Sequence, residues 1–216
     1  MKKMHRLLPL LLCLVLQSCA EDKYTEDGKD YLPAPSIAIE QLDLEDIAPW
    51  RQNVINEALK VRDESHWPKY LFGSADPTQG GFDCSGAMYY VLKRMGYSPK
   101  RTSSNQYLWL AKEGRVYQVT PQADSLQHQD FSHLQPGDLV FWSGTYAPTD
   151  GRTVKVTHVG MYLGHQQGYH RPVMICASKG RYYNGARRDG YGLYDFKLPS
   201  AKSRSKIVAY GSLPPL

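Results

Sequence analysis

The chain has 216 residues, 42% of them hydrophobic, which is enough to bury the core of one domain and leave a short extension. Its formal net charge is +5, from 26 basic and 21 acidic residues. This excess forms no lysine or arginine stripe and matches no nucleic-acid-binding motif, so we expect no nucleic-acid partner.

The N-terminal residues have the pattern of an export signal. Residues 1–6 are basic and residues 7–16 are almost continuously apolar, too short a run to span a bilayer. The following Leu16-Gln17-Ser18-Cys19 resembles the processing site of bacterial lipoproteins, where the cysteine is acylated. The alternative is an ordinary signal peptide with a chance cysteine. We expect residues 1–18 to be removed, which leaves a net charge of +2. Lipid on Cys19 would then anchor the protein in the cell envelope outside the cytoplasm, on the outer membrane and facing the periplasm or the surface.

Residues 19–43 are polar and acidic without a sustained period, which predicts a tether between lipid and domain. The domain is expected over residues 44–216. Apolar residues at helical spacing predict a first helix over 47–61, with Asp46 as its N-cap.

The rest of the domain has helices first and strands afterwards. Helical spacing follows Cys84 and ends at Gly96, and another helix is expected over residues 103–113. Strands are predicted over residues 116–119, 138–142, 156–163, 173–177 and 207–210. This order favours an α+β domain with an antiparallel sheet.

Cys84 is the candidate nucleophile. It lies in Phe82-Asp83-Cys84-Ser85-Gly86 at the start of a predicted helix, where the dipole and free backbone N–H groups favour a thiolate. Small polar neighbours leave those N–H groups free to bind an oxyanion, and the N–H of Cys84 is one candidate donor. His158 begins a predicted strand and would serve as the general base. Other interpretations are a buried structural thiol and a histidine without function.

Five blocks in order resemble the NlpC-type (NlpC/p-sixty) cell-wall cysteine peptidases, which have a papain-like fold. The blocks lie at residues 70–73, 82–86, 101–106, 134–141 and 158–164. The resemblance implies hydrolysis of peptidoglycan stem peptides, commonly at the γ-D-glutamyl bond to a diamino acid. It also implies that Cys84 is the nucleophile, that His158 is the base and that Tyr70 lies near the thiol. Asp83 and Ser85 match positions that, in some members, help bind the free amino end of the substrate.

The third catalytic position departs from the family pattern. The family usually places a polar residue, most often histidine, on the next strand to orient the base. If a loop spans residues 165–172, antiparallel pairing puts Cys176 opposite His158, and a thiol is a weak hydrogen-bond partner. His170 is the alternative, but it would place Pro172 inside the strand. Cys84 and Cys176 could also form a disulfide that silences the enzyme.

Two other functions stay open for this sequence. The domain could be a non-catalytic module that binds wall fragments, or a thiol amidase or acyltransferase acting on another substrate outside the cytoplasm. No cofactor or metal is implied, because histidines and carboxylates form no ligand-like cluster. The sequence does not indicate an oligomeric state.

Overall fold

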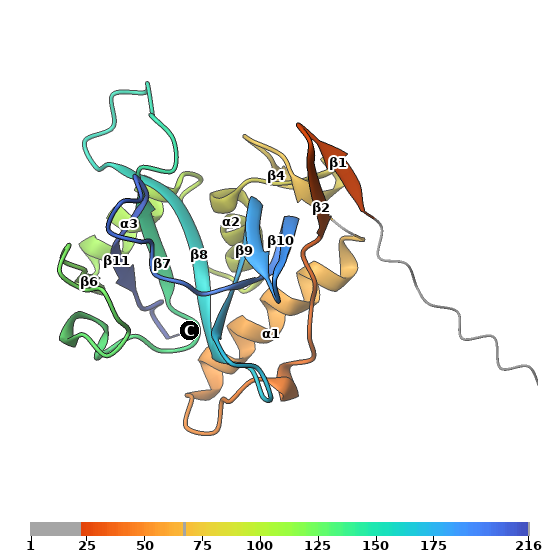
Figure 1. Cartoon of the computed structure of the whole chain (residues 1–216). Coiled ribbons are helices and arrows are strands. Elements are labelled where there is room, and N and C mark those ends of the chain that lie inside the picture. Colours follow the sequence, from red (N-terminus) through yellow and green to blue (C-terminus); the bar gives the residue numbers. More distant parts are fainter. Residues whose placement is uncertain (1–22, 67, 216) are drawn as a thin grey trace, which may run out of the picture.

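A computed structural model describes residues 23–66 and 68–215, which form an α+β domain built on one large sheet (Figure 1). The strand order is β1-β2-β10-β9-β8-β7-β11-β6, and every pairing is antiparallel except that of β2 with β10. Its strands are β1 Tyr24–Glu26, β2 Lys29–Pro33, β6 Val116–Gln118, β7 Leu139–Ser143, β8 Val156–His165, β9 Pro172–Tyr183, β10 Ala186–Asp195 and β11 Lys206–Gly211. The expected fold class is therefore confirmed.

Three helices pack against the sheet to form the main core. They are α1 Pro49–Glu64, α2 Cys84–Arg94 and α3 Ser103–Lys112. Apolar residues of α1 and α2 pack with one face of the sheet, to which β8 contributes Val159, Met161 and Leu163. The opposite face, with Tyr162 of β8, belongs to a second and smaller core. Alternating residues of β8 thus serve two cores, as the two-residue period of a strand requires.

The predicted helices are confirmed, with one error at a terminus. Helix α1 is capped at Ala48 without a side-chain bond and has Pro49 in its first turn, so Asp46 is not its N-cap. Proline suits that position because its missing N–H would have no helical partner. Helix α3 is capped by Thr102, whose side chain accepts from the N–H of Asn105. Gly96 follows α2 with φ +89°, as expected of a residue that ends a helix.

The predicted tether is wrong from Tyr24 onward. Strands β1 and β2 form a hairpin whose second strand extends the sheet beside β10. Ala34 is fully buried, its N–H donates to the carbonyl of Asp189, and its own carbonyl accepts from Arg62. The prediction failed because this pairing joins segments about 155 residues apart, which no local period reveals. The pairing of β2 also requires β10, a strand that the sequence pattern did not predict.

The pairing predicted between the strands of His158 and Cys176 is also wrong. Met161 pairs with Ile175 and Tyr162 with Met174, which is two residues away from the expected register. The cause lies at the hairpin end. Strand β8 continues past the expected turn to His165, which pairs with Pro172, and the register shifts between Tyr162 and Gly164. Pro172 is the first residue of β9, a position where proline is tolerated.

Candidate active site

Cys84 is the first residue of α2, and close backbone packing fixes its place. A three-stranded sheet of β3 Lys69–Tyr70, β5 Gly81–Phe82 and β4 Ala75–Asp76 precedes the helix. A β-carbon on Gly86 would lie 2.0 Å from the carbonyl oxygen of Ser74, so only glycine lets this turn of α2 approach the small sheet. The small residues around Cys84 therefore serve packing as well as access.

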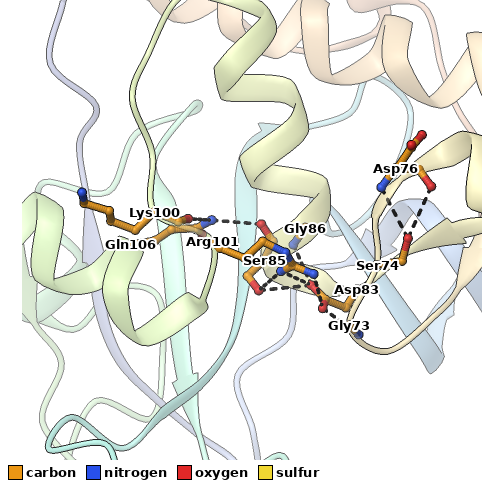
Figure 2. Close-up of polar contacts among 9 residues, drawn as sticks. All are labelled: Gly73, Ser74, Asp76, Asp83, Ser85, Gly86, Lys100, Arg101 and Gln106. Atoms are coloured by element: carbon orange, nitrogen blue, oxygen red, sulfur yellow. Dashed lines mark hydrogen bonds and ion pairs between the residues drawn. The ribbon is translucent and has the colours of Figure 1, made fainter.

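Asp83, the residue before Cys84, caps the helix and joins a polar network with Ser85 and Arg101 (Figure 2). Its Oδ1 accepts from the N–H of Gly86 at 2.6 Å, and its Oδ2 accepts from the N–H of Gly73 at 2.9 Å. Arg101 donates through both terminal nitrogens, at 3.0 Å to Oδ1 and 2.8 Å to Oδ2. Ser85 Oγ donates to Asp83 and accepts from Arg101. The Asp83 carboxylate is thus already paired with Arg101.

Arg101 lies in one of the five family blocks, but its sequence context predicted no role for it. The signal that could have found it is its place one residue before the cap of α3. Buried Gln106 of that helix donates to the carbonyls of Ser85 and Lys100, which ties the start of α3 to the start of α2. These bonds bring Arg101 to Asp83 (Figure 2).

The Cys84 thiol is almost completely buried, with 7% of the residue exposed. Burial, followed by the charge of Asp83, raises the pKa of Cys84 to about 11. Backbone N–H groups of Val159, Ser85 and Cys84 act in the opposite direction by stabilising the thiolate. The expectation of a resting thiolate is therefore not met, because desolvation outweighs the helix terminus.

His158 lies near the start of β8, one residue before Val159, and only 6% of it is exposed. Its ring meets the indole of Trp142 edge-on at 5.4 Å between centroids. Its Nε2 is buried without a hydrogen-bond partner. Burial, with a further contribution from the positive charge of Arg181, lowers the pKa of His158 well below its usual value. The Cys84 thiol and the His158 imidazole are thus both neutral at rest, and no hydrogen bond joins them within the described residues.

Neither candidate for the third catalytic residue donates to the His158 ring. Cys176 lies beside Gly160, where a β-carbon on the glycine would be 2.9 Å from that of Cys176. Its thiol is free and fully buried, and burial raises its pKa to about 12. His170 lies on the exposed hairpin loop, with its ring tilted against that of Tyr169. The orienting role of Cys176 stays a prediction. Both cysteines are free, so the structure contains no disulfide between them.

A cavity of about 280 Å³ opens over Cys84. Tyr70, Asp83 and Ser85 line it as expected, with Arg101, Tyr146 and Arg152 in addition. The pKa of Tyr70 is raised by burial and by the nearby Cys84 and Asp83, so its hydroxyl is neutral and can donate a hydrogen bond. The cavity therefore combines a nucleophile, a hydroxyl and charged groups.

Comparison with known proteins adds family membership to this geometry. The family model described as NlpC/P60 family matches residues 68–186, which include both Cys84 and His158. The chain belongs to the NlpC/P60 family. Membership agrees with the papain-like arrangement of a cysteine at a helix start beside an antiparallel sheet.

Two curated relatives come from Bacillus subtilis (strain 168). The bifunctional muramidase/DL-endopeptidase CwlT is 26% identical over 162 residues, covering 75% of this chain and 36% of the relative. The gamma-DL-glutamyl hydrolase is 32% identical over 96 residues, covering 44% of this chain and 18% of the relative. This chain thus spans well under half the length of either.

Among solved structures, a protein described as similar to lipoprotein, NLP/P60 family, from Staphylococcus aureus matches with a TM-score of 0.47 at 23% identity. The match covers 84% of this chain and 44% of that one. Within residues 23–66 and 68–215, no helix is both long and apolar enough to cross a membrane.

Proposed function

We propose that this protein is a cysteine peptidase that hydrolyses peptide stems of peptidoglycan at a γ-D-glutamyl bond to a diamino acid. The observation that carries the proposal is the position of Cys84. Its thiol lies at a capped helix start, where backbone N–H groups of Val159, Ser85 and Cys84 favour the thiolate, and it lines a cavity of about 280 Å³. Membership of the NlpC/P60 family and the names of the relatives support the same reaction class.

The proposed reaction begins with the Cys84 thiol and the His158 imidazole both neutral. His158 takes the proton of the Cys84 thiol as the sulfur attacks the glutamyl carbonyl carbon and forms a C–S bond. The oxyanion forms beside the helix start, where backbone N–H groups can donate to it. The C–N bond then breaks, and His158 gives its proton to the leaving amine. Water, activated by the same histidine, hydrolyses the thioester, which releases the acid and restores the thiol.

The cavity suggests how the acyl side of the substrate is held. Tyr70, Asp83 and Ser85 would receive the free amino end of the stem, as the family resemblance implies. Because Arg101 already forms a fork with Asp83, the ammonium would join this ion pair rather than meet a lone carboxylate. The Tyr70 hydroxyl remains available at the cavity wall.

The lipoprotein assignment is part of the proposal. Cys19 and the signal lie outside the described residues. With lipid on Cys19, the protein would be anchored in the envelope, where its substrate is located. Replacement Cys19→Ala should release the protein from membranes or block its maturation, measured by fractionation. A variant bound to membranes at the full level would indicate a protein partner instead.

Digestion of purified peptidoglycan, with fragment masses read by mass spectrometry, tests the activity. The unaltered protein should release fragments cut at the γ-D-glutamyl bond. Cys84→Ala should release none, and His158→Ala should lower turnover by orders of magnitude. Cys176→Ala serves as the matched cysteine control and should retain most activity. Fragment binding without cleavage would favour the wall-binding module, and cleavage that survives Cys84→Ala would refute the mechanism.

A further inference from the structure

Strand β3, which carries Tyr70 into the wall of the Cys84 cavity, lies at the edge of the small sheet. On its inner side it pairs with β5, where the N–H of Leu71 donates to the carbonyl of Phe82 at 2.9 Å. Successive backbone N–H groups of a strand point to opposite edges, so the N–H of Tyr70 points away from β5. The outer edge of β3 therefore needs partners from another part of the fold.

Strand β10 supplies the partners for this outer edge. The N–H of Tyr191 donates to the carbonyl of Pro68 at 2.8 Å. Two residues earlier in β10, the side chain of Asp189 accepts a hydrogen bond from the N–H of Tyr70. Only 2% of Asp189 is exposed. A buried carboxyl group thus takes the place of a neighbouring strand at the residue that lines the cavity.

The N-terminal hairpin holds the same carboxyl group. The hydroxyl of Tyr24 in β1 donates to the Asp189 side chain. The Tyr24 ring is stacked on that of Tyr31 at 5.2 Å between centroids, and the Lys69 ammonium of β3 lies 5.3 Å from its centroid. Strand β2 pairs with β10 at Asp189 itself, opposite Pro33. The hairpin therefore fixes both the backbone and the side chain of Asp189.

The two hydrogen bonds to Asp189 support each other. Burial raises the pKa of the Asp189 carboxyl, while the bonds from Tyr24 and Tyr70 and the charges of Lys179 and Lys69 act against this rise. An ionised carboxylate is a stronger acceptor than a protonated one. Loss of the Tyr24 hydroxyl should therefore also weaken the bond to the Tyr70 N–H.

We propose that Tyr24 and Asp189 are positioning residues that hold Tyr70 at the wall of the Cys84 cavity. This inference rests on the proposed peptidase activity, in which Tyr70 receives the free amino end of the stem. Both residues lie outside residues 68–186, the segment that the family model matches. The support of the cavity wall thus comes from strands that flank this segment in the chain.

Hydrogen exchange in the whole protein, followed by NMR at single amides, tests this coupling without any need for cleavage. Tyr24→Phe removes the hydroxyl and keeps the ring. It should speed exchange at the Tyr70 amide about tenfold, the size expected for one lost hydrogen bond. The Leu71 amide is the internal control, because it is bonded to β5 and should keep its rate. Tyr31→Phe takes a hydroxyl from the neighbouring ring, leaves the bond of Tyr24 to Asp189 intact, and should change neither rate.

Steady-state hydrolysis of a stem peptide with a free amino end tests the consequence for the substrate. Tyr24→Phe should raise KM about fivefold and leave kcat within about twofold, because Tyr70 contributes to binding rather than to the chemical step. In a Tyr70→Phe background, Tyr24→Phe should change KM by less than about twofold, because the hydroxyl that it positions is gone. A fall in kcat at unchanged KM, or an equal rise of KM in both backgrounds, would overturn the inference.

The exchange data have outcomes that contradict the inference as well. Equal acceleration at the Tyr70 and Leu71 amides would show that the hairpin only stabilises the domain as a whole. No acceleration at either amide, or equal effects of Tyr24→Phe and Tyr31→Phe, would also overturn the coupling.

Peptidoglycan digestion reports separately on the peptidase proposal. Selective acceleration at the Tyr70 amide in a protein that cleaves no peptidoglycan would refute the activity and keep the link between hairpin and cavity wall. Cleavage by a protein in which Tyr24→Phe alters neither exchange nor KM would refute the link and keep the activity.

Discussion

The rate at which iodoacetamide alkylates Cys84 depends on the fraction of its thiol that is ionised. The raised pKa of about 11, against an ordinary 9.0, predicts that the folded protein at neutral pH has about 100-fold less thiolate than a free cysteine, because each pKa unit is a factor of ten. The helix terminus acting alone would predict the opposite, a pKa below 9 and rapid alkylation. The two effects therefore differ in sign, which makes the measurement decisive.

The assay follows alkylation of the peptide that carries Cys84 by mass spectrometry, from pH 6 to about pH 12, so that the range brackets the expected midpoint. Restricted access slows the reaction equally at every pH, so the midpoint of the profile reports the pKa alone. The same peptide in denatured protein supplies the reference midpoint near the ordinary value. We expect the folded midpoint to lie about two pH units above this reference. A folded midpoint at or below about pH 8 would refute the neutral resting pair and indicate a thiolate–imidazolium pair instead.

Three further predictions concern stability. Arg51 and Asp138 form a buried ion pair at 2.7 Å. Asp138→Asn should leave the charge of Arg51 uncompensated and lower the free energy of unfolding, measured in urea, by about 3 kcal/mol. A loss below about 1 kcal/mol would contradict this. Gly160→Ala should lower the free energy of unfolding by about 1–3 kcal/mol, because the new β-carbon would collide with that of Cys176. In a Cys176→Gly background most of this loss should disappear. An equal loss in both backgrounds would exclude the collision. Because burial raises the pKa of Cys176 to about 12, its contribution to stability is complete below pH 9 and is lost as the pH rises toward 12. Alkaline unfolding should therefore be shallower in Cys176→Ala, and an unchanged slope would show that this thiol does not titrate in the fold.

Local sequence patterns were sufficient to predict the three helices and most strands of the family domain. Helical spacing predicted α1, α2 and α3, and alternation or apolar runs predicted most strands from β6 onward. These signals are local because a helix or strand buries one face at a fixed period. The same reasoning placed Cys84 at the start of α2, and the order of the five blocks predicted a family that comparison confirmed.

Strand β10 lacked such a signal. Its sequence has two arginines and an aspartate directly after Ala186 and contains two glycines, yet residues 188–194 are all buried. Its two edges pair with β2 and β9, and α1, β3 and β5 pack against it, so its residues do not alternate between core and solvent. Without β10, residues 24–43 had nothing to pair with and were interpreted as a tether.

The sequence by itself determined the candidate residues for the proposed chemistry, because Cys84, its cap Asp83 and His158 are fixed by residue type within short motifs. Only the tertiary structure decided their charge state and surroundings. Three features depend on segments that are distant in the chain. They are the burial that raises the pKa of Cys84, the two-bond ion pair of Arg101 with Asp83, and the charge of Arg181 near His158. Desolvation and Coulomb interactions act through space, so their sign at a residue follows from what the fold packs around it.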